Sequence, residues 1–377
     1  MDFELSDDQR QLQDSVRSVL ERECPPGLVR DAYDGRRDQV NRLWKMISGL
    51  GWPAIEVPES LNGLGMGFVE LSLIAEEMGR AVAPVPFMST VAQFVPMVLE
   101  TGSDEQKKVL LGSVLEGGST GAVAIAEPGS GWDYARCETR AVRTADGWVI
   151  NGRKAFVFDG ATASTVLVVA RSEGNGHVGL FAVPSGSVRA TESKLIDPSQ
   201  PLAELEFDGV PVGDDGVLVE PGDSDGAEGI RRAVERATTA LTVSMSGTCR
   251  ALFDTTLQYA KDREQFGRPI GSFQAIKHRL VDMLIALERA TSLAYFAAMT
   301  IAEDDPRRSI AVSMAKAAAG DCQRIIVQDG LQLHGGIGYM WEQDLHFYLK
   351  RAKSSDLLFG SASAHKAKVA RTLGLVA

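Results

Sequence analysis

The stretch Tyr259–Ile270, YAKDREQFGRPI, separates two long segments whose apolar residues recur at helical spacing. Before it, an apolar or small residue returns every three or four positions over Leu241–Tyr259, and the same spacing follows over Ile276–Ala294. Gly267 and Pro269 are residues that end and restart helices. The sequence therefore predicts two long helices joined by a charged turn, and on this evidence alone the stretch is an ordinary αα-hairpin.

Helical spacing also extends away from this stretch in both directions. Downstream, the alanine-rich segment 310–333 suits close helix packing and runs into Gln328–Tyr339, QDGLQLHGGIGY, where glycines end the helix. Upstream, the first hundred or so residues carry helical apolar faces, and Ser6–Gln9 has the form of a capping box at a helix start. Helices are thus expected at both ends of the chain.

The middle of the chain has a different period. From about Thr120, short β-branched and apolar runs such as Thr165–Val169 are separated by turn residues, among them the pair Asn151-Gly152. Five or more such runs favour an antiparallel sheet or barrel over βαβ units. The segment Gly213–Gly229 is rich in Gly and Asp and is expected to be a loop.

The order of these regions is α, then β, then α, which places the chain in the α+β class. A length of 377 residues is enough for two or three domains with sizeable cores. We expect an N-terminal helical domain over residues 1–117, a middle β domain over 118–225 and a C-terminal helical domain over 226–377.

Charge and composition exclude several classes of function. The chain has 39 Lys and Arg against 50 Asp and Glu, a net charge of −11, so it repels phosphate backbones and anionic lipids and nucleic acid is not an expected partner. No apolar stretch close to the roughly 18 residues of a membrane span is evident, and the acidic start Met1–Glu4 is unlike a secretory signal. Four widely spaced cysteines fit reduced thiols and argue against a zinc site. A cytoplasmic protein without membrane attachment is expected.

The generic catalytic motifs in the sequence do not identify a function. Gly117–Gly121 matches G-x-S-x-G, but a helix precedes it and a strand follows, which is the reverse of a nucleophile turn. Gly335–Gly338 follows a helix and lacks the strand and acidic residue of a dinucleotide fold. The five histidines show no spacing typical of metal ligands, so no metal is expected.

Two segments are more specific, and with them the chain resembles the acyl-CoA dehydrogenase family over its whole length. Residues 263–270 read Arg-x-Gln-Phe-Gly-x-Pro-Ile, residues 332–339 read Gln-x-x-Gly-Gly-x-Gly-Tyr, and Glu127-Pro128 is a weaker third match. The resemblance implies a helical domain, a β-barrel domain and a four-helix bundle, usually assembled as a tetramer that binds FAD. It also implies α,β-desaturation of an acyl-CoA thioester, with electrons passed to an electron-transferring flavoprotein.

The resemblance assigns cofactor contacts to both signatures. Arg263 and Gln265 would donate to the FAD pyrophosphate of a neighbouring subunit, a role that suits the guanidinium fork, and Phe266 would pack against the adenosine half. Gln332 and the backbone of Gly335-Gly336 would approach the same dinucleotide, closely enough to require residues without a Cβ. The cofactor would therefore span a subunit interface.

By the resemblance, this chain lacks the catalytic base of the family. Relatives carry it as a glutamate 27 residues after the signature Gln, where this chain has Phe359, and a minority carry it 26 residues before the signature Arg, where this chain has Ala237. Neither side chain accepts a proton. Glu235 is near in sequence but turns about 200° away on a helix, and Asp356 is the candidate for a relocated base.

Positions that would serve the chain's own flavin also depart from the family. Ala126 replaces a threonine, Phe156 and Phe158 replace a Trp-x-Thr pair, and Trp132 replaces the Ser of a Gly-Ser-Asp loop. Each lost hydroxyl would leave a buried polar ring edge without a partner, at a cost of about 1–3 kcal/mol. Ser361, two residues after Phe359, remains a candidate cofactor contact.

Residues that hold a neighbour's FAD are thus retained, whereas those serving this chain's own flavin and substrate are lost. The chain resembles the base-less subunit of bacterial α2β2 acyl-CoA dehydrogenases, including those acting on steroid side-chain CoA esters, and would complete the FAD site of a homologous partner. Three alternatives stay open: a self-sufficient homotetramer with a relocated base, a non-catalytic acyl-CoA-binding or structural homologue, and a flavin monooxygenase on the same fold.

Overall fold

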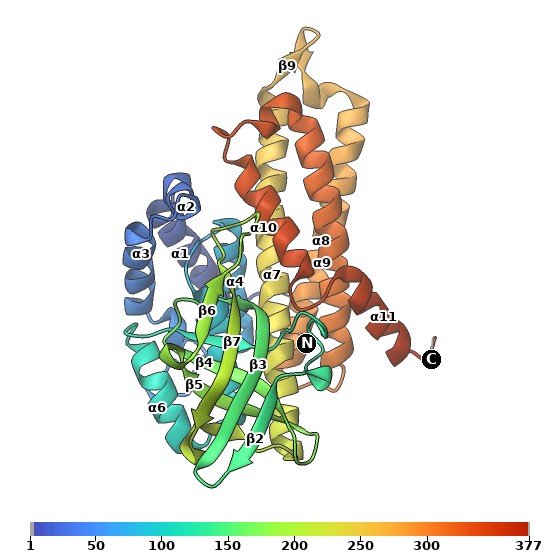
Figure 1. The fold of residues 1–377 in the computed structure, drawn as a ribbon. Coiled ribbons are helices and arrows are strands. Elements are labelled where there is room, and N and C mark those ends of the chain that lie inside the picture. The colour runs from blue at the N-terminus through green and yellow to red at the C-terminus, as the bar shows by residue number, and fades with distance from the viewer. Residues whose placement is uncertain (1–3, 376–377) are drawn as a thin grey trace. The chain divides into compact units, whose positions relative to one another are not determined.

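The structure is a computed structural model that describes residues 4–375 (Figure 1). The chain folds into two compact units. The helical unit comprises Met1–Asp34, Phe68–Ala83 and Thr238–Ala377 as far as these are described, and the β unit comprises Gly35–Gly67 and Pro84–Ala237. The predicted order of helical, β and helical segments is confirmed. The boundaries after residues 117 and 225 remain predictions.

The helical unit is built from helices that pack along one another, as the yellow-to-red bundle in Figure 1 shows. Its helices are α1 (Asp7–Glu23), α2 (Pro26–Tyr33), α4 (Phe68–Arg80), the second part of α7 (Ser224–Asp262), α8 (Gln274–Ala302), α9 (Arg308–His334), α10 (Leu345–Leu357) and α11 (Ala362–Thr372). The predicted capping box is confirmed, since the Gln9 amide donates to Ser6 Oγ at 3.2 Å and the Ser6 amide donates to Gln9 Oε1 at 3.0 Å. Leu252, Met283 and Ile326 are fully buried in the bundle core.

Small residues set the closest helix contact in this unit. A Cβ on Gly79 of α4 would lie 1.9 Å from the Ser244 carbonyl oxygen of α7, and one on Gly247 would lie 2.0 Å from the Glu76 carbonyl oxygen. The Thr248 hydroxyl donates to the Gly79 carbonyl at 2.9 Å. Glycine at 79 and 247 therefore permits backbone contact between α4 and α7, which any side chain would prevent.

One helix contradicts the expectation that no apolar stretch is long enough to span a membrane. Within α8, an 18-residue window has a mean hydropathy of 1.3. By length and composition alone, this helix is long and apolar enough to cross a membrane. Half of that window is buried inside the unit, where Met283, Leu287 and Ala290 contribute to the bundle core. The buried face of a bundle helix carries such residues, which the sequence pattern showed as a helical stripe.

The β unit is organised around one sheet with the strand order β6-β7-β3-β2-β4-β5-β8, with β1 paired to β4. Its strands are β1 (Gly121–Ala124), β2 (Arg140–Thr144), β3 (Gly147–Phe158), β4 (Thr165–Ser172), β5 (Val178–Pro184), β6 (Arg189–Glu192), β7 (Leu202–Val212) and β8 (Val217–Val219). Most pairs are antiparallel, as predicted, but β1 and β2 both run parallel to β4. The alternating strands bury one face, including Val166, Val168, Leu205 and Phe207.

Helices complete this unit. They are α3 (Asp38–Gly49), the π-helix Phe87–Phe94, α5 (Val95–Thr101), α6 (Asp104–Leu115) and the first part of α7. The π-helix is buried throughout, and Phe94 lies so close to β1 that a Cβ on Gly121 would be 2.1 Å from its ring.

Two local expectations in the β unit are wrong. The pair Asn151-Gly152 is not a hairpin turn but a register shift inside the 12-residue strand β3, where Gly152 has a φ of 146° and lies against Thr139. The hairpin turn lies earlier, between Thr144 and Gly147, which are paired. The expected loop Gly213–Gly229 contains β8 and the start of α7, because Gly226 allows the first turn of the helix to lie against Val219.

Candidate functional site

The charged turn between the two long helices is a β-hairpin at the end of the bundle, labelled β9 in Figure 1. β9 (Glu264–Gln265) and β10 (Arg268–Pro269) pair Gln265 with Arg268, which leaves Phe266 and Gly267 as the two turn residues. Both have a positive φ, 55° and 77°, as in a type I′ turn. The Phe266 side chain is 90% exposed although its backbone is strained for a bulky residue. An aromatic ring held in solvent in this way is typical of a binding surface.

The polar residues of the hairpin are available for binding. The Arg263 amide donates to the Tyr259 carbonyl at 2.8 Å and so continues the last turn of α7. Its guanidinium is exposed and has no hydrogen-bond or ion-pair partner among residues 4–375. The Gln265 side chain is also exposed, with one amide hydrogen directed to the Glu264 carbonyl at 2.7 Å. The predicted pyrophosphate donors are therefore presented at the surface.

The structure brings the two signature segments together. Tyr259 at the end of α7 stacks on His334 at the end of α9, with ring centroids 4.4 Å apart and an interplanar angle of 22°. Gln332 lies exposed in the last turn of α9. Gly335 then has φ 60° and ψ −139°, a conformation that is essentially restricted to glycine. The hairpin and the glycine segment thus share one end of the bundle.

Gly336 tests whether this surface fits a nucleotide. Its φ is not positive, and a Cβ on it would have no heavy atom of the described chain within 4 Å. The chain's own backbone therefore gives no reason for glycine at this position. A glycine whose missing side chain opens an empty space suits the close approach of an external group. Together with the free Arg263 guanidinium, this surface fits the anionic half of a dinucleotide.

The predicted base position lies elsewhere in the same unit, in the turn Leu358–Ser361 between α10 and α11. Phe359 is 3% exposed and has a φ of 57°, and Gly360 follows with a φ of 100°. The Phe359 carbonyl lies 2.9 Å from His365 Nε2, which donates to it. Ser361 accepts from the Ala364 amide at 3.4 Å and caps α11, so it retains a defined structural role. A buried phenyl ring occupies the position at which the resemblance predicts the base.

The second base position has no carboxylate free to act either. Ala237 lies on α7 in the β unit and is buried. Glu235, two residues earlier, forms an ion pair with Arg231, which also binds Glu228. The hydrogen bonds that Arg231 donates to Glu228 and the nearby Glu235 charge raise the pKa of Arg231, so the guanidinium stays charged and holds both carboxylates. Glu235 therefore belongs to an ion-pair network on its own helix.

Asp356 is enclosed rather than exposed to a substrate. It lies in the last turn of α10, and its Oδ1 is buried without a hydrogen-bond partner among the described residues. A Cβ on Gly320 of α9 would lie only 2.4 Å from this oxygen and 2.7 Å from the Ala362 Cβ. The carboxylate thus points into the packing between α9 and α11, which disfavours its use as a relocated base.

The positions expected around the isoalloxazine lie in the β unit and are apolar, and two of them, Ala126 and Phe158, are buried. Ala126 is buried, and its carbonyl accepts from the Ala155 amide at 2.8 Å. Phe158, at the end of β3, is 1% exposed. Phe156 has a φ of 55° and its ring is partly exposed. These three positions offer a flavin ring edge no side-chain hydroxyl, so they fit a flavin less well than the hairpin fits the nucleotide half.

Glu127 holds a buried network that the sequence did not reveal. Its Oε1 accepts from Lys154 Nζ at 2.7 Å, the Thr139 hydroxyl at 2.6 Å and the Thr139 amide at 3.0 Å, and Lys154 is fully buried in β3. Burial alone would raise the pKa of Glu127, but the Lys154 charge and these hydrogen bonds lower it to about 2. The signature acid therefore ties β1, β2 and β3 together. A lysine that directly precedes the apolar run Ala155–Phe158 of β3 is the signal that could have indicated it.

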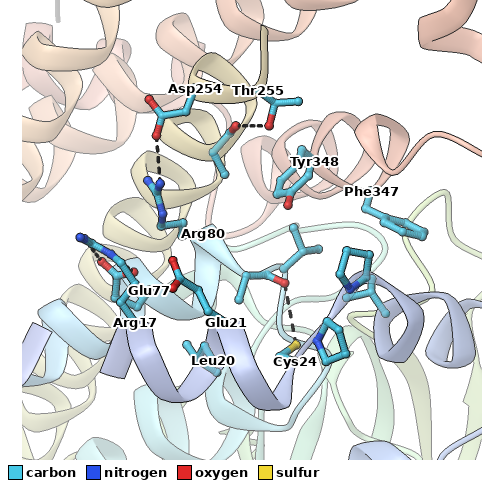
Figure 2. Close-up of a pocket in the computed structure, with 16 residues that line it drawn as sticks. Arg17, Leu20, Glu21, Cys24, Glu77, Arg80, Asp254, Thr255, Phe347 and Tyr348 are labelled. Carbon is cyan, nitrogen blue, oxygen red and sulfur yellow. Dashed lines mark hydrogen bonds and ion pairs between the residues drawn. The ribbon is translucent and has the colours of Figure 1, made fainter. Parts of the chain in front are cut away.

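The helical unit also contains a pocket of about 320 Å³ that none of the predicted site residues lines (Figure 2). Helices α1, α4, α7 and α10 surround it, with Leu20 and Phe347 on its apolar side. Two ion pairs lie at its edge, Arg17 with Glu77 at 2.7 Å and Arg80 with Asp254 at 3.0 Å. Its arginines are thus neutralised by neighbouring carboxylates, and the pocket lies apart from the signature segments.

Known proteins match the whole chain. The N-terminal, middle and C-terminal domain families of acyl-CoA dehydrogenase match residues 6–118, 122–210 and 225–374. The short-chain specific acyl-CoA dehydrogenase of Bos taurus mitochondria is 30% identical over 376 residues, covering 97% of this chain and 90% of the relative.

Solved structures with the same fold include chains whose sequences are also similar to this one. The ChsE4–ChsE5 complex of Mycobacterium tuberculosis contains a chain 26% identical to this one, with a TM-score of 0.89 and full coverage of both chains. A steroid ACAD, Tcur3481–Tcur3483, is 29% identical with a TM-score of 0.87 and 98% coverage of both. Signatures, fold and relatives coincide, and the chain belongs to the acyl-CoA dehydrogenase family, FAD-binding oxidoreductases that act on acyl-CoA thioesters.

Proposed function

We propose that this chain is the base-less subunit of a heteromeric acyl-CoA dehydrogenase and that it completes the FAD site of a catalytic partner. The carrying observation is the contrast between an exposed, unpaired Arg263 hairpin and a base position filled by the buried Phe359. A chain that acted alone would need a carboxylate at position 359 or 237. A chain that no longer served any nucleotide would have no use for a strained, solvent-exposed Phe266.

The residues of this chain divide the binding task by chemistry. The Arg263 guanidinium would hold the pyrophosphate oxygens, and Gln265 would donate beside it. Phe266 covers the adenosine, since an aromatic ring both stacks and excludes water. Gln332 and the open backbone at Gly336 receive the rest of the nucleotide. A bound FAD would supply a hydride acceptor for the β-hydrogen of the acyl-CoA, and this chain's own residues would hold its nucleotide half.

The relatives support a heteromeric assembly. The ChsE4–ChsE5 structure is a complex of two named chains, and Tcur3481–Tcur3483 is described as a steroid ACAD. We therefore propose an α2β2 arrangement with a homologous subunit, an acyl-CoA substrate and an electron-transferring flavoprotein as acceptor. Steroid side-chain CoA esters are the substrate class to test first, with straight-chain acyl-CoA esters as the comparison.

The experiment is to purify the chain alone and together with the homologous subunit encoded beside it. We expect the lone chain to bind little FAD, and the co-purified assembly to be yellow and to oxidise acyl-CoA with a dye or flavoprotein acceptor. Full flavin content and turnover by the lone chain would overturn the partner requirement. A colourless assembly that binds CoA esters would identify a structural homologue, and oxygen consumption dependent on a flavin reductase would identify a monooxygenase.

A further inference from the structure

Lys316 is the buried charge that the proposed function leaves unexplained. It lies in the middle of α9, and its side chain is 0% exposed. Its Nζ donates to the Asp356 carbonyl at 2.8 Å and to the Ser355 carbonyl at 3.3 Å. Burying an ammonium group is costly unless its hydrogen bonds and charge are compensated. The two carbonyls show where that cost is offset.

The contacts of Lys316 fall at the end of α10. Ser355 and Asp356 belong to the last turn of that helix, which ends at Leu357, so their carbonyls have no partner within the helix. A cation at this end also interacts favourably with the helix dipole. The enclosed Asp356 carboxylate adds a nearby opposite charge. Lys316 therefore fixes the point at which the chain leaves α10 for the turn Leu358–Ser361.

His365 fixes the same turn from its other side. It is buried in α11, and its Nε2 donates to the Phe359 carbonyl at 2.9 Å. The neighbouring Gly360 makes room for the ring, since a Cβ there would lie 3.2 Å from His365 Nε2. Phe359 and Gly360 both have a positive φ, which a loose loop would relax. The turn is thus held at its entry by α9 and at its centre by α11.

We propose that Lys316, together with His365, is a positioning residue that sets the backbone of the turn at the family's base position, and that this chain has kept the support for a base while losing the base itself. The proposal rests on the proposed function, but all of the contacts that support the turn lie within this chain. Lys316 acts through the carbonyls of Ser355 and Asp356, the groups to which its Nζ donates.

The first test measures the turn directly by amide hydrogen exchange of the protein in the assembly in which it is purified. Lys316→Met keeps the length and volume of the side chain and removes its donors. We expect exchange of amides 357–362 to accelerate by about tenfold or more, while the amides of α9 stay close to wild type. The matched control is Lys366→Met, which breaks the 2.8 Å ion pair between Lys366 and Asp321, another link between α11 and α9, without touching the turn.

Two results would overturn the proposal. Unchanged exchange at 357–362 would show that the turn does not depend on Lys316. Acceleration spread evenly over α9 and α10, or equal acceleration in Lys366→Met, would show general loss of packing instead of local positioning. Each outcome is read without any enzymatic activity.

The second test uses a restored carboxylate. In a Phe359→Glu background, added Lys316→Met is expected to lower kcat by about tenfold with KM within about twofold, because misplacing a base affects the transition state more than ground-state binding. Equal loss in kcat and thermal stability with the Lys366→Met control would contradict positioning. If Phe359→Glu gains no activity, more than the base is missing at this site, and the exchange experiment alone decides the role of Lys316.

Discussion

The hairpin at residues 263–269 and the turn at residues 358–361 belong to the same unit and have opposite properties. The hairpin presents an exposed arginine, glutamine and phenylalanine, and the Phe266 ring meets only the edge of Phe273 among the ring contacts of the described residues. The turn buries Phe359 and is held by hydrogen bonds from α9 and α11. Both contain a phenylalanine with positive φ, yet one ring is in solvent and the other in the interior. Under the proposed function, polar groups are exposed where another molecule would use them and are absent where this chain would use them.

Placing a carboxylate at position 359 is expected to have the largest effect, because it would make the buried turn chemically active like the exposed hairpin. Phe359→Glu in the co-purified assembly is expected to raise desaturation at this chain's own site by at most about 10²- to 10⁴-fold over background, the full range that a positioned general base contributes, because the buried, apolar Ala126 and Phe158 offer a flavin there no hydroxyl. The measurement is acyl-CoA oxidation with the partner's own base replaced by its amide. Phe359→Gln is the matched control, since it has the same shape and cannot take a proton. Equal rates for the two variants would mean that more than the base has been lost.

Removing the hairpin arginine tests the other side of the comparison. Arg263→Ala is expected to weaken FAD binding by the assembly about 10- to 100-fold, because a bidentate charge-assisted contact is worth roughly 1.5–3 kcal/mol. Flavin released on dilution is the readout. Arg268→Ala in the same hairpin is the control, because its guanidinium lies over the Phe273 ring, 4.1 Å from the centroid. Equal loss in both variants would indicate a collapsed hairpin.

Breaking the Glu127–Lys154 pair separates stability from binding. Glu127→Gln leaves Lys154 buried without its counter-ion, and we expect the free energy of unfolding to fall by about 3 kcal/mol. The free energy of unfolding is measured by urea denaturation, followed with a signal from the β unit. Adding Lys154→Met to Glu127→Gln is expected to recover part of the loss, since both buried charges are then gone. A double variant no more stable than Glu127→Gln would contradict this account of the network.

Acid is expected to loosen the base turn before the hairpin. Burial, with smaller effects from Lys368 and Lys316, lowers the pKa of His365 to about 4 from its ordinary 6.5. The unfolded chain therefore binds this proton first, and stability falls as pH drops from about 6.5 toward 4, by up to about 3 kcal/mol. Unfolding followed against pH for wild type and His365→Gln tests this. The variant should show a shallower slope across that window, and parallel curves would refute the assignment.

The smallest effect is expected at Gly336. Gly336→Ala should leave the stability of the chain within about 0.5 kcal/mol, because no described atom lies near the added methyl. It should nevertheless weaken FAD binding by about threefold to tenfold if a nucleotide lies against this backbone. Gly112→Ala, at another open position on α6, is the control for substitution alone. Unchanged flavin affinity in Gly336→Ala would place the nucleotide elsewhere.

Periodicity and turn residues were sufficient for the order of elements, because the stripes of α7 and α8 repeat over many turns. They failed where one glycine decides the outcome. Asn151-Gly152 has the composition of a hairpin turn, but its contact with Thr139 makes it a bulge inside β3. The same limit applies to the start of α7, where Gly226 packs on Val219. Such contacts depend on how neighbouring elements pack against each other, and the composition of a turn does not report them.

Some residues of the candidate site could be predicted from the sequence, and others could not. Resemblance supplied the residues of the hairpin and the missing base, and these assignments remain predictions of role. The buried supports, Lys154 under Glu127 and Lys316 behind Asp356, could not be read from spacing, because a lysine in a strand or helix is normally exposed. Only the three-dimensional contacts show that both are enclosed.

The open space beside Gly336 means that selection on this residue would act through another molecule. A substitution there would leave the protein abundant, folded and unchanged by any assay of its own integrity. Screens that score expression level or protease resistance would pass such a variant as harmless. Its defect would surface only as a colour missing from the assembled enzyme.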